Sequence, residues 1–279
     1  MSGRRLRRRF TSGLMTGVVV TLAGLAVLPL LLIFGYLVAK GATSINLDFF
    51  LKTPVPAGQS GGGVAHAIVG SAIVVGLASL IGVPIGIGAG VFLAEYGAGR
   101  LGWLVRFVAD VMNGTPSIII GIFAWAFMVK PLGFFSALAG AVALAVILVP
   151  LIARTTEEMI KLVPHSLREA ALALGAPKWK VILSVVLPTA RAGVITASVL
   201  ALARSAGETA PLLLTALGND FFSTDLLRPI GALPLQIYRY AISPYDDWHT
   251  KAWGTSLVLV FVIGLVGVLL RYVARPRVR

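Results

Sequence analysis

The sequence predicts an all-α membrane protein with six transmembrane helices and both termini in the cytoplasm. Of its 279 residues, 57% are hydrophobic, above the roughly 45–50% of a soluble domain. These residues are grouped in blocks long enough for spanning helices, which need about 20 residues. No connection between the blocks could hold a second domain, so residues 1–279 are expected to form one transmembrane domain with its core at 66–273.

The expected spans are residues 14–39, 66–94, 103–129, 134–153, 189–217 and 252–273. The first follows the arginines of SGRRLRRRF and is too long for the apolar region of a cleaved signal peptide. The second carries Gly82, Gly86 and Gly90, one every four residues, which predicts a stripe along which another helix packs closely. A phosphate-binding loop would instead need a preceding strand and a Lys-Ser/Thr pair.

The third span is interrupted by Asn113-Gly114-Thr115-Pro116. The helix after the break, 117–129, would be only about 20 Å long, too short for a bilayer core of about 30 Å. Pro116 suits a first helical position and Thr115 suits an N-cap. A helix N-terminus there, with Ser117, would bind an anion if it faced a protein-lined cavity. Alternatively, the break lies at the cytoplasmic interface and only turns the chain.

The basic residues predict the orientation. Six spans place both termini on one side, and with that side inside only six Lys and Arg fall in the outer loops. These are Lys40, Lys52, Lys130, Arg228, Arg239 and Lys251. Retention of Lys and Arg on the cytoplasmic side accounts for the net charge of +13. A nucleic-acid partner has no further support, and the expected location is the cytoplasmic (inner) membrane.

The long outer loop, residues 218–250, carries several aromatic side chains: Tyr238, Tyr240, Tyr245 and Trp248. Such residues are typical of an aromatic belt at the membrane surface. A docking surface for an external partner would have the same composition, and the sequence leaves both interpretations open.

The longest expected cytoplasmic segment, residues 154–188, reads RTTEEMIKLVPHSLREAALALGAPKWKVILSVVLP. Pro164 and Ser166 are typical of a helix start and Gly175 of a helix end, and Pro177 opens a second helix. The first helix presents an apolar face that suits a partner's groove. This face consists of Leu167, Ala170, Ala171 and Leu174.

Glu169-Ala170-Ala171, Gly175 six positions after the glutamate, and Leu187-Pro188 resemble the EAA loop of the membrane subunits of ATP-binding-cassette importers. Val185 stands where that loop usually has isoleucine. The resemblance implies a type I importer permease whose loop helix docks into a groove on a separate ATPase subunit. The residues that it assigns to ATPase coupling are Glu169, Ala170, Ala171, Leu174, Gly175 and Pro188.

The fifth span carries Arg204 and Glu208 within ALARSAGETAPLLLTAL. An arginine at the centre of a spanning helix costs at least about 2.5–3.5 kcal/mol on insertion scales, so a functional role is expected. In a continuous helix the two residues share one face and can partly neutralise each other. The guanidinium could donate two hydrogen bonds to an oxyanion such as phosphate, with Glu208 holding it in place. Alternatively, the pair is an interhelical ion pair that stabilises packing.

The same stretch, with GTPSIIIGIFAW (114–125) and LPLQIY (233–238), resembles the PstA-type membrane subunits of phosphate importers. The resemblance implies several partners: a PstC-type sister permease, a homodimer of PstB-type ATPase subunits that holds ATP and Mg²⁺, an external PstS-type phosphate-binding protein, and the lipid bilayer. It implies phosphate translocation past a pathway site. The residues expected on this pathway are Arg204, Glu208, Thr209, Thr115 and Ser117.

The chain contains no G-x-x-x-x-G-K-[ST] motif, so it is expected to be non-catalytic, with ATP hydrolysis on a separate subunit. His66 and His165 are isolated and lack metal-ligand spacing, so neither a metal nor a cofactor is expected in this chain. Two alternatives remain: an importer for another oxyanion, and an ion-coupled secondary anion transporter. The second would need its own coupling acids, and only Asp110 and Glu208 could lie at membrane depth.

Overall fold

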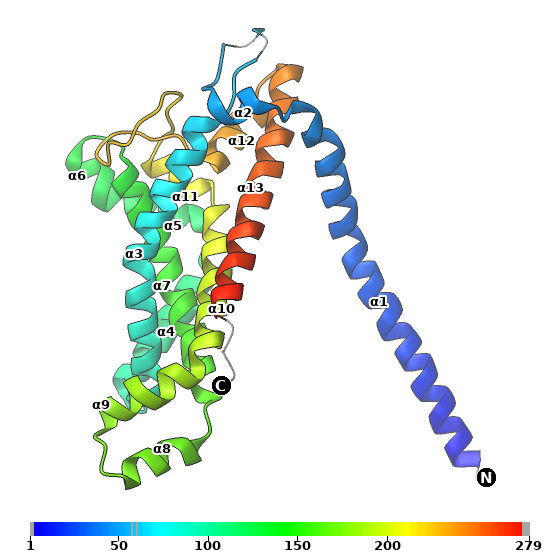
Figure 1. The fold of residues 1–279 in the computed structure, drawn as a ribbon, viewed down its shortest axis with the longest axis vertical. Helices are drawn as coiled ribbons and strands as arrows, with labels where there is room; N and C mark the ends of the chain where they lie inside the picture. Colours follow the sequence, from blue (N-terminus) through cyan, green and yellow to red (C-terminus); the bar gives the residue numbers. More distant parts are fainter. Residues whose placement is uncertain (1–2, 57, 60, 275–279) are drawn as a thin grey trace.

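The protein is a bundle of long helices in the computed structural model, which describes residues 3–56, 58–59 and 61–274 (Figure 1). Within these residues, five helices are long and apolar enough to cross a membrane, and one bent helix pair can supply a sixth span. This confirms the predicted fold class. The five long helices are α1 (Gly3–Gly41), α3 (Ala65–Glu95), α7 (Ala137–Lys161), a continuous helix over Lys178–Ala206, and α13 (Asp246–Ala274).

The helix ends are distributed as the predicted topology requires. The start of α1 and the short helix α8 (His165–Ala173) lie at one end of the molecule, and α13 runs from the opposite end toward it (Figure 1). Helices α2 (Leu47–Leu51) and α12 (Leu233–Ala241) lie at the opposite end. The basic residues therefore gather at the end that carries α8, which we call the cytoplasmic end. Arg275, Arg277 and Arg279, which belong to the basic residues expected on the cytoplasmic side, lie outside the described residues.

The centre of the bundle is the contact between α3 and α7. A Cβ atom added to Gly82 would lie 2.9 Å from Cβ of Leu148, and one added to Gly86 would lie 2.7 Å from Cβ of Ile152. At Gly90 the corresponding distance to the Thr156 side chain is 2.5 Å. The glycine stripe therefore lets the two helices touch, as predicted, and in a membrane such close packing is a main source of helix association.

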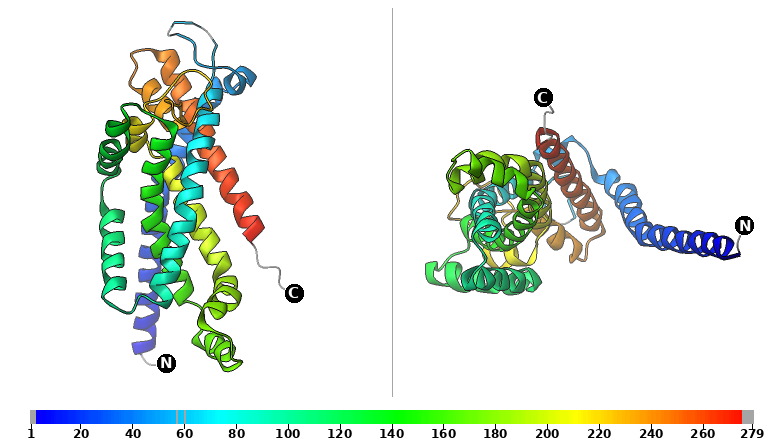
Figure 2. Two further views of the ribbon diagram at one scale, coloured as in Figure 1. Left: turned by 90° about the vertical axis from the view of Figure 1, so that its left-hand side faces the viewer. Right: turned by 90° about the horizontal axis from the view of Figure 1, so that it is seen from below.

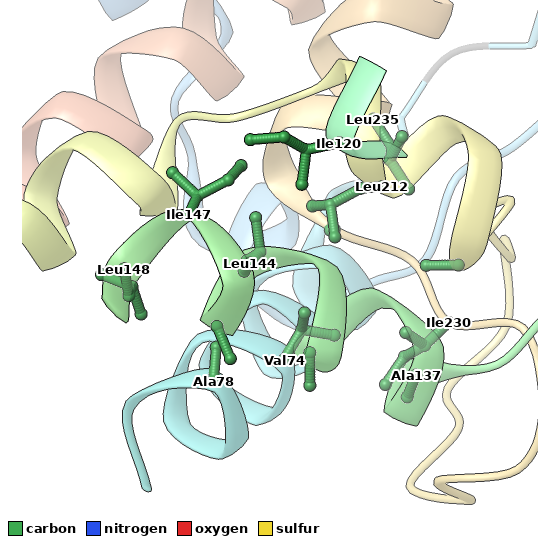
Figure 3. Close-up of a cluster of buried hydrophobic side chains, with 14 of the residues drawn as sticks. Val74, Ala78, Ile120, Ala137, Leu144, Ile147, Leu148, Leu212, Ile230 and Leu235 are labelled. Carbon is green, nitrogen blue, oxygen red and sulfur yellow. The ribbon is translucent and has the colours of Figure 1, made fainter. Parts of the chain in front are cut away.

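A buried apolar cluster attaches shorter helices to this pair (Figure 3). Val74 and Ala78 of α3 and Leu144 and Leu148 of α7 form its base, each no more than 1% exposed. Shorter segments complete it with Ile120, Leu212, Ile230 and Leu235.

The third span breaks where the sequence predicted. Helix α4 (Arg100–Gly114) and helix α5 (Ser117–Ala124) meet at an angle of 106°. Helix α5 continues through a π-helical turn, η2 (Trp125–Val129), into α6 (Lys130–Leu132). The predicted caps were wrong by one position. Pro116 is the N-cap, and the Thr115 hydroxyl instead donates to the Val111 carbonyl, 2.8 Å away, within α4.

The predicted bounds of the fifth span, 189–217, were wrong at both ends. The helix begins as α9 (Lys178–Val181), passes through the π-helical turn η3 (Ile182–Val186) and continues as α10 (Leu187–Ala206). The wider π-helical turn precedes Pro188, whose ring and missing N–H would disturb a regular α-helix there. The helix then stops at Gly207, and a separate helix α11 (Ala210–Thr215) follows.

The segment before α12, residues 230–233, packs against the first turns of α3 at the outer end. The Leu233 N–H donates to Oγ of Ser71 at 2.8 Å, and a Cβ atom at Gly70 would collide with the Gly231 carbonyl. Tyr240 is 1% exposed, and burial raises its pKa to about 12, so it stays neutral. Of the four aromatic residues expected at the surface, Tyr240 therefore belongs to the protein interior.

Helix α1 stands apart from the bundle, as Figure 2 shows most clearly in the view from below. None of its apolar window is buried. It joins the rest through its outer end, where Tyr36 meets Trp253 of α13 edge to face at 5.1 Å. A Cβ atom at Gly41 would lie 2.8 Å from the Trp253 carbonyl oxygen. Most of the apolar surface of α1 is therefore exposed in this chain.

Candidate functional site

A cavity of about 270 Å³ lies between the two broken spans. One ordered water needs only about 10–15 Å³ by the same kind of measure, so the cavity has room for a small hydrated anion. It gathers four of the five residues that the sequence placed on an anion pathway. Its lining consists of Met112, Asn113, Gly114, Thr115, Pro116, Ser117, Ile120, Ile147, Leu151, Arg204 and Glu208.

The two breaks face each other across this cavity. The α4–α5 break supplies Met112–Ser117, the last turn of α10 supplies Arg204, and the break between α10 and α11 supplies Glu208. The second halves of the two spans pack together, because a Cβ atom at Gly121 of α5 would lie 2.8 Å from Cα of Pro211 in α11. Non-helical backbone at membrane depth is stable only where protein buries it or where it lines a hydrated cavity.

The remaining wall belongs to α7. Ile147 and Leu151, one turn apart, line the cavity on the side of the bundle core. Ile147 and Ile120 also belong to the buried apolar cluster (Figure 3). The polar breaks therefore rest on a packed surface, which holds their positions relative to each other.

Arg204 and Glu208 do not pair as expected. The predicted shared helix face is absent because α10 ends at Ala206 and Gly207 caps it, which leaves Glu208 outside the helix. Arg204 is exposed, Glu208 is half-buried, and neither side chain makes an ion pair or hydrogen bond with another described residue. The Arg204 guanidinium is consequently free to donate to a ligand in the cavity.

The start of α5 adds a second positive element. The Ile119 N–H is bonded to the Pro116 carbonyl at 3.0 Å, whereas the N–H groups of Ser117 and Ile118 have no backbone acceptor among the described residues. Unpaired N–H groups and the helix dipole make a helix N-terminus favourable for anions. Of the two interpretations left open for this break, the structure supports the one in which the start of α5 faces a protein-lined cavity. Thr209, the N-cap of α11, is not part of the lining.

The expected coupling helix is present as α8. Leu167 is 43% exposed and Leu174 is 88% exposed, so both are available to a partner. Glu169, Ala170 and Pro188 are exposed as well. Ala171 was expected on the same face, but it packs against the apolar cluster at the cytoplasmic end of the bundle. Leu172, which the sequence argument missed, is 47% exposed.

Gly175 ends this helix with φ +80°, in the left-handed region that glycine adopts readily. The predicted turn between α8 and α9 is therefore confirmed. The Gly175 N–H is bonded to the Leu172 carbonyl at 2.9 Å and the Ala176 N–H to the Ala171 carbonyl at 3.4 Å, which closes the last turn of α8.

Sequence reasoning missed a buried carboxylate between the cavity and the coupling helix. Glu157 is 0% exposed and lies 2.7 Å from Arg106, 2.5 Å from Arg154 and 2.6 Å from Lys161. Arg154 also lies 2.8 Å from Asp110. The spacing of Arg154, Glu157 and Lys161 on one helix face was the available signal. The contact with α4, which buries the group, has no local signal.

Among the residues that the structure describes, no group of three His, Cys, Asp or Glu side chains could hold a metal ion. His66 is buried at the start of α3, where a Cβ atom at Gly231 would lie 2.6 Å from its ring.

Comparison with known proteins places these features in context. Residues 82–279 match the family described as binding-protein-dependent transport system inner membrane component. The phosphate transport system permease protein PstA of Yersinia pestis is 46% identical over 239 residues, which cover 85% of this chain and 80% of the relative. PstA 1 of Mycobacterium tuberculosis is 36% identical over 98% of this chain and 92% of its own length.

The fold also has a counterpart among solved structures. A crystal structure titled as a bacterial ABC transporter involved in the import of the acidic polysaccharide alginate contains a chain that matches with a TM-score of 0.68. The match covers 99% of this chain and all of the other one, at 15% sequence identity. At that identity the similarity shows the fold alone.

Proposed function

The chain belongs to the binding-protein-dependent transport system inner membrane component family, and from this we propose that it is the membrane subunit through which an ATP-driven importer moves inorganic phosphate into the cell. Members of this family are multi-pass inner membrane permeases, a class without catalytic activity. They work with a separate ATPase and a substrate-binding protein. Phosphate is the substrate class named for relatives that are 46% and 36% identical.

The observation that carries the proposal is the unpaired Arg204 in the cavity between the broken spans. A guanidinium offers a planar pair of donors that matches an oxyanion. The N–H groups at the start of α5 and the hydroxyl group of Ser117 supply further donors. Because broken helices at such sites present their N-termini to anionic substrates, the arrangement suits phosphate.

Glu208 gives the same cavity an opposing charge. A site built only from positive groups would retain phosphate, whereas a transporter must also release it. We assign Glu208 the role of limiting this retention by repulsion, and of balancing Arg204 when the cavity holds no anion. This replaces the direct ion pair expected from the sequence.

The energy for transport would come from other subunits. A PstB-type homodimer would bind ATP with Mg²⁺ and receive α8 in a groove, with Leu167, Leu172 and Leu174 as apolar contacts. A PstC-type permease would complete the pathway, and a PstS-type protein would deliver phosphate at the outer end. In this scheme the present chain binds no metal and no cofactor of its own.

Uptake of radiolabelled phosphate into proteoliposomes that contain the reconstituted complex tests the proposal. Uptake should require ATP inside the vesicle and binding protein on the outer side. Excess sulfate should not compete. Uptake driven by a proton gradient without ATP would instead support a secondary transporter. If another oxyanion inhibited uptake more strongly than unlabelled phosphate does, that oxyanion would be the substrate.

A further inference from the structure

The turn at the end of α3, residues 93–97, is held from two sides. On one side lie residues of the coupling helix α8 and of α9. On the other lies the buried carboxylate cluster around Glu157. This turn, which we call the α3 corner, therefore stands between the segment expected to meet the ATPase and the helices that line the cavity.

The first contact comes from α8. The Arg168 guanidinium lies 3.1 Å from Oε1 of Glu95, and the two side chains are only 14% and 9% exposed. The same guanidinium donates to the Ile160 carbonyl at 2.8 Å and to the Val163 carbonyl. Arg168 thus joins α8 to the last turn of α7 and to the end of α3 at once.

A second contact comes from the far side of the coupling turn. Nζ of Lys178, the first residue of α9, donates to the Glu95 carbonyl at 2.6 Å and lies 4.2 Å from the ring centroid of Tyr96. Glu95 is therefore bound through its side chain by α8 and through its backbone by α9. A displacement of either helix would act on the same residue.

From the bundle side, Arg106 of α4 completes the connection. It donates to the Gly97 carbonyl at 2.7 Å and to the Leu93 carbonyl at 2.6 Å, while its Nε contacts Glu157 of α7. The cluster continues to Arg154 and Asp110. Asp110 is two residues before Met112, the first residue of the cavity lining. Ion pairs and hydrogen bonds, joined through the backbone of the α3 corner, thus extend from α8 almost to the cavity.

We propose that Glu95 and Arg168 are positioning residues that attach the coupling helix to α3, so that ATPase-driven movement of α8 displaces the α3 corner and with it the cavity walls. The inference rests on the proposed function. Arg168 suits this role because several hydrogen bonds from one planar group fix an orientation that a single contact would leave free. The outward face of α8 remains available, since Leu167 and Leu174 are exposed.

The test compares Glu95→Gln with wild type in the full reconstituted complex. The change keeps the size of the side chain and removes the charge that faces Arg168. The ATPase should still co-purify and hydrolyse ATP, while the phosphate moved per ATP should fall by about 2- to 30-fold, the range for residues along such contact networks.

Glu158→Gln is the matched control. It removes the same charge from an exposed glutamate at the cytoplasmic end of α7, for which the structure shows no ion pair with any described residue. Its phosphate-to-ATP ratio should equal that of wild type. Equal ratios in Glu95→Gln and Glu158→Gln would overturn the proposal.

Arg168→Lys decides the case in which Glu95→Gln does not assemble. Lysine keeps the positive charge opposite Glu95 but cannot reach Glu95 and the carbonyls of Ile160 and Val163 with one planar group. We expect a stable complex with a reduced phosphate-to-ATP ratio. A wild-type ratio in Arg168→Lys would contradict the attachment.

A distance measurement separates this inference from the proposed function. Because the chain has no cysteine, spin labels at Ala98→Cys and Ser166→Cys report the spacing between the α3 corner and α8. In wild type the spacing should not change when ATP binds to the complex, and in Glu95→Gln it should widen or spread. If the spacing in Glu95→Gln equals that of wild type, the attachment is refuted, whether or not the complex takes up phosphate. If the wild-type complex takes up no phosphate, only the proposed function is refuted.

Discussion

At the scale of single residues, the exposure of Arg204 explains how a charge is tolerated so far inside a membrane protein. The cavity beside it can hold water, and the end of α10 leaves the guanidinium without a competing partner. A charged group in this position retains hydration, so the penalty of burial in hydrocarbon does not apply in full. A free guanidinium in a hydrated cavity is also the arrangement that an arriving anion needs.

Arg204→Ala should reduce ATP-dependent phosphate uptake by about 10- to 150-fold, the range for losing a hydrogen bond to a charged group. Arg204→Lys should be intermediate, because lysine keeps the charge but lacks the paired donors. Both should be measured in proteoliposomes at equal amounts of assembled complex. Arg191→Ala, at an exposed position near the start of α10, serves as the control and should transport normally. Normal uptake in Arg204→Ala would remove this residue from the pathway.

Glu157 is expected to stabilise the folded protein and not to contact the substrate, because it is not part of the cavity lining. Glu157→Gln would leave Arg106, Arg154 and Lys161 without their shared carboxylate. We expect a loss of about 3 kcal/mol, at the low end for a broken buried ion pair because water still reaches the arginines. Thermal unfolding of the purified complex should show a lower Tm than for Glu158→Gln, and an unchanged Tm would mean that the cluster adds nothing to stability.

At the scale of elements, the turn between α8 and α9 depends on Gly175. Valine at φ +80° is strained by about 1–3 kcal/mol, so Gly175→Val should displace α8 and weaken ATPase binding. Gly175→Asn, which tolerates this conformation better, should retain the interaction. Co-purification of the ATPase measures the effect. Equal recovery with all three chains would show that the turn is not needed for docking.

The contact between α3 and α7 depends on Gly86 in the same way. Gly86→Val would place atoms within 2.7 Å of Ile152, so the helices must separate, and overpacking of this kind costs about 1–3 kcal/mol. Gly88→Val is the matched control, because a Cβ atom at Gly88 meets nothing within 4 Å. The Tm of the complex should fall for the first variant and not for the second; the reverse order would refute the packing assigned here.

At the scale of the whole molecule, the orientation in the membrane can be tested by labelling single introduced cysteines, because the chain has no cysteine of its own. Gln59→Cys lies before α3 at the outer end, and Ser166→Cys lies in α8 at the cytoplasmic end. An impermeant thiol reagent added to intact cells should label the first and spare the second until the membrane is opened. Labelling of Ser166→Cys but not of Gln59→Cys in intact cells would show that the orientation is the reverse of the one assigned here.

Local features let the sequence by itself determine much of this protein. Apolar blocks give the spans, the Gly114–Pro116 interruption gives the break in the third span, and the glycine period gives the α3–α7 contact, because each depends on residues within a few turns. The EAA-like spacing likewise located α8 and its closing glycine.

Tertiary structure alone decided how these parts meet. The apolar run 189–217 reads as one helix, yet packing of α11 against α5 and α7 separates it from α10 and moves Glu208 off the helix that carries Arg204. Arg106 and Glu157 are 51 positions apart, and Arg168 and Glu95 are 73 positions apart. The cavity joins residues that are farther apart still, such as Thr115 and Arg204. Contacts of that separation depend on the packing of whole helices, which no local pattern of residues encodes.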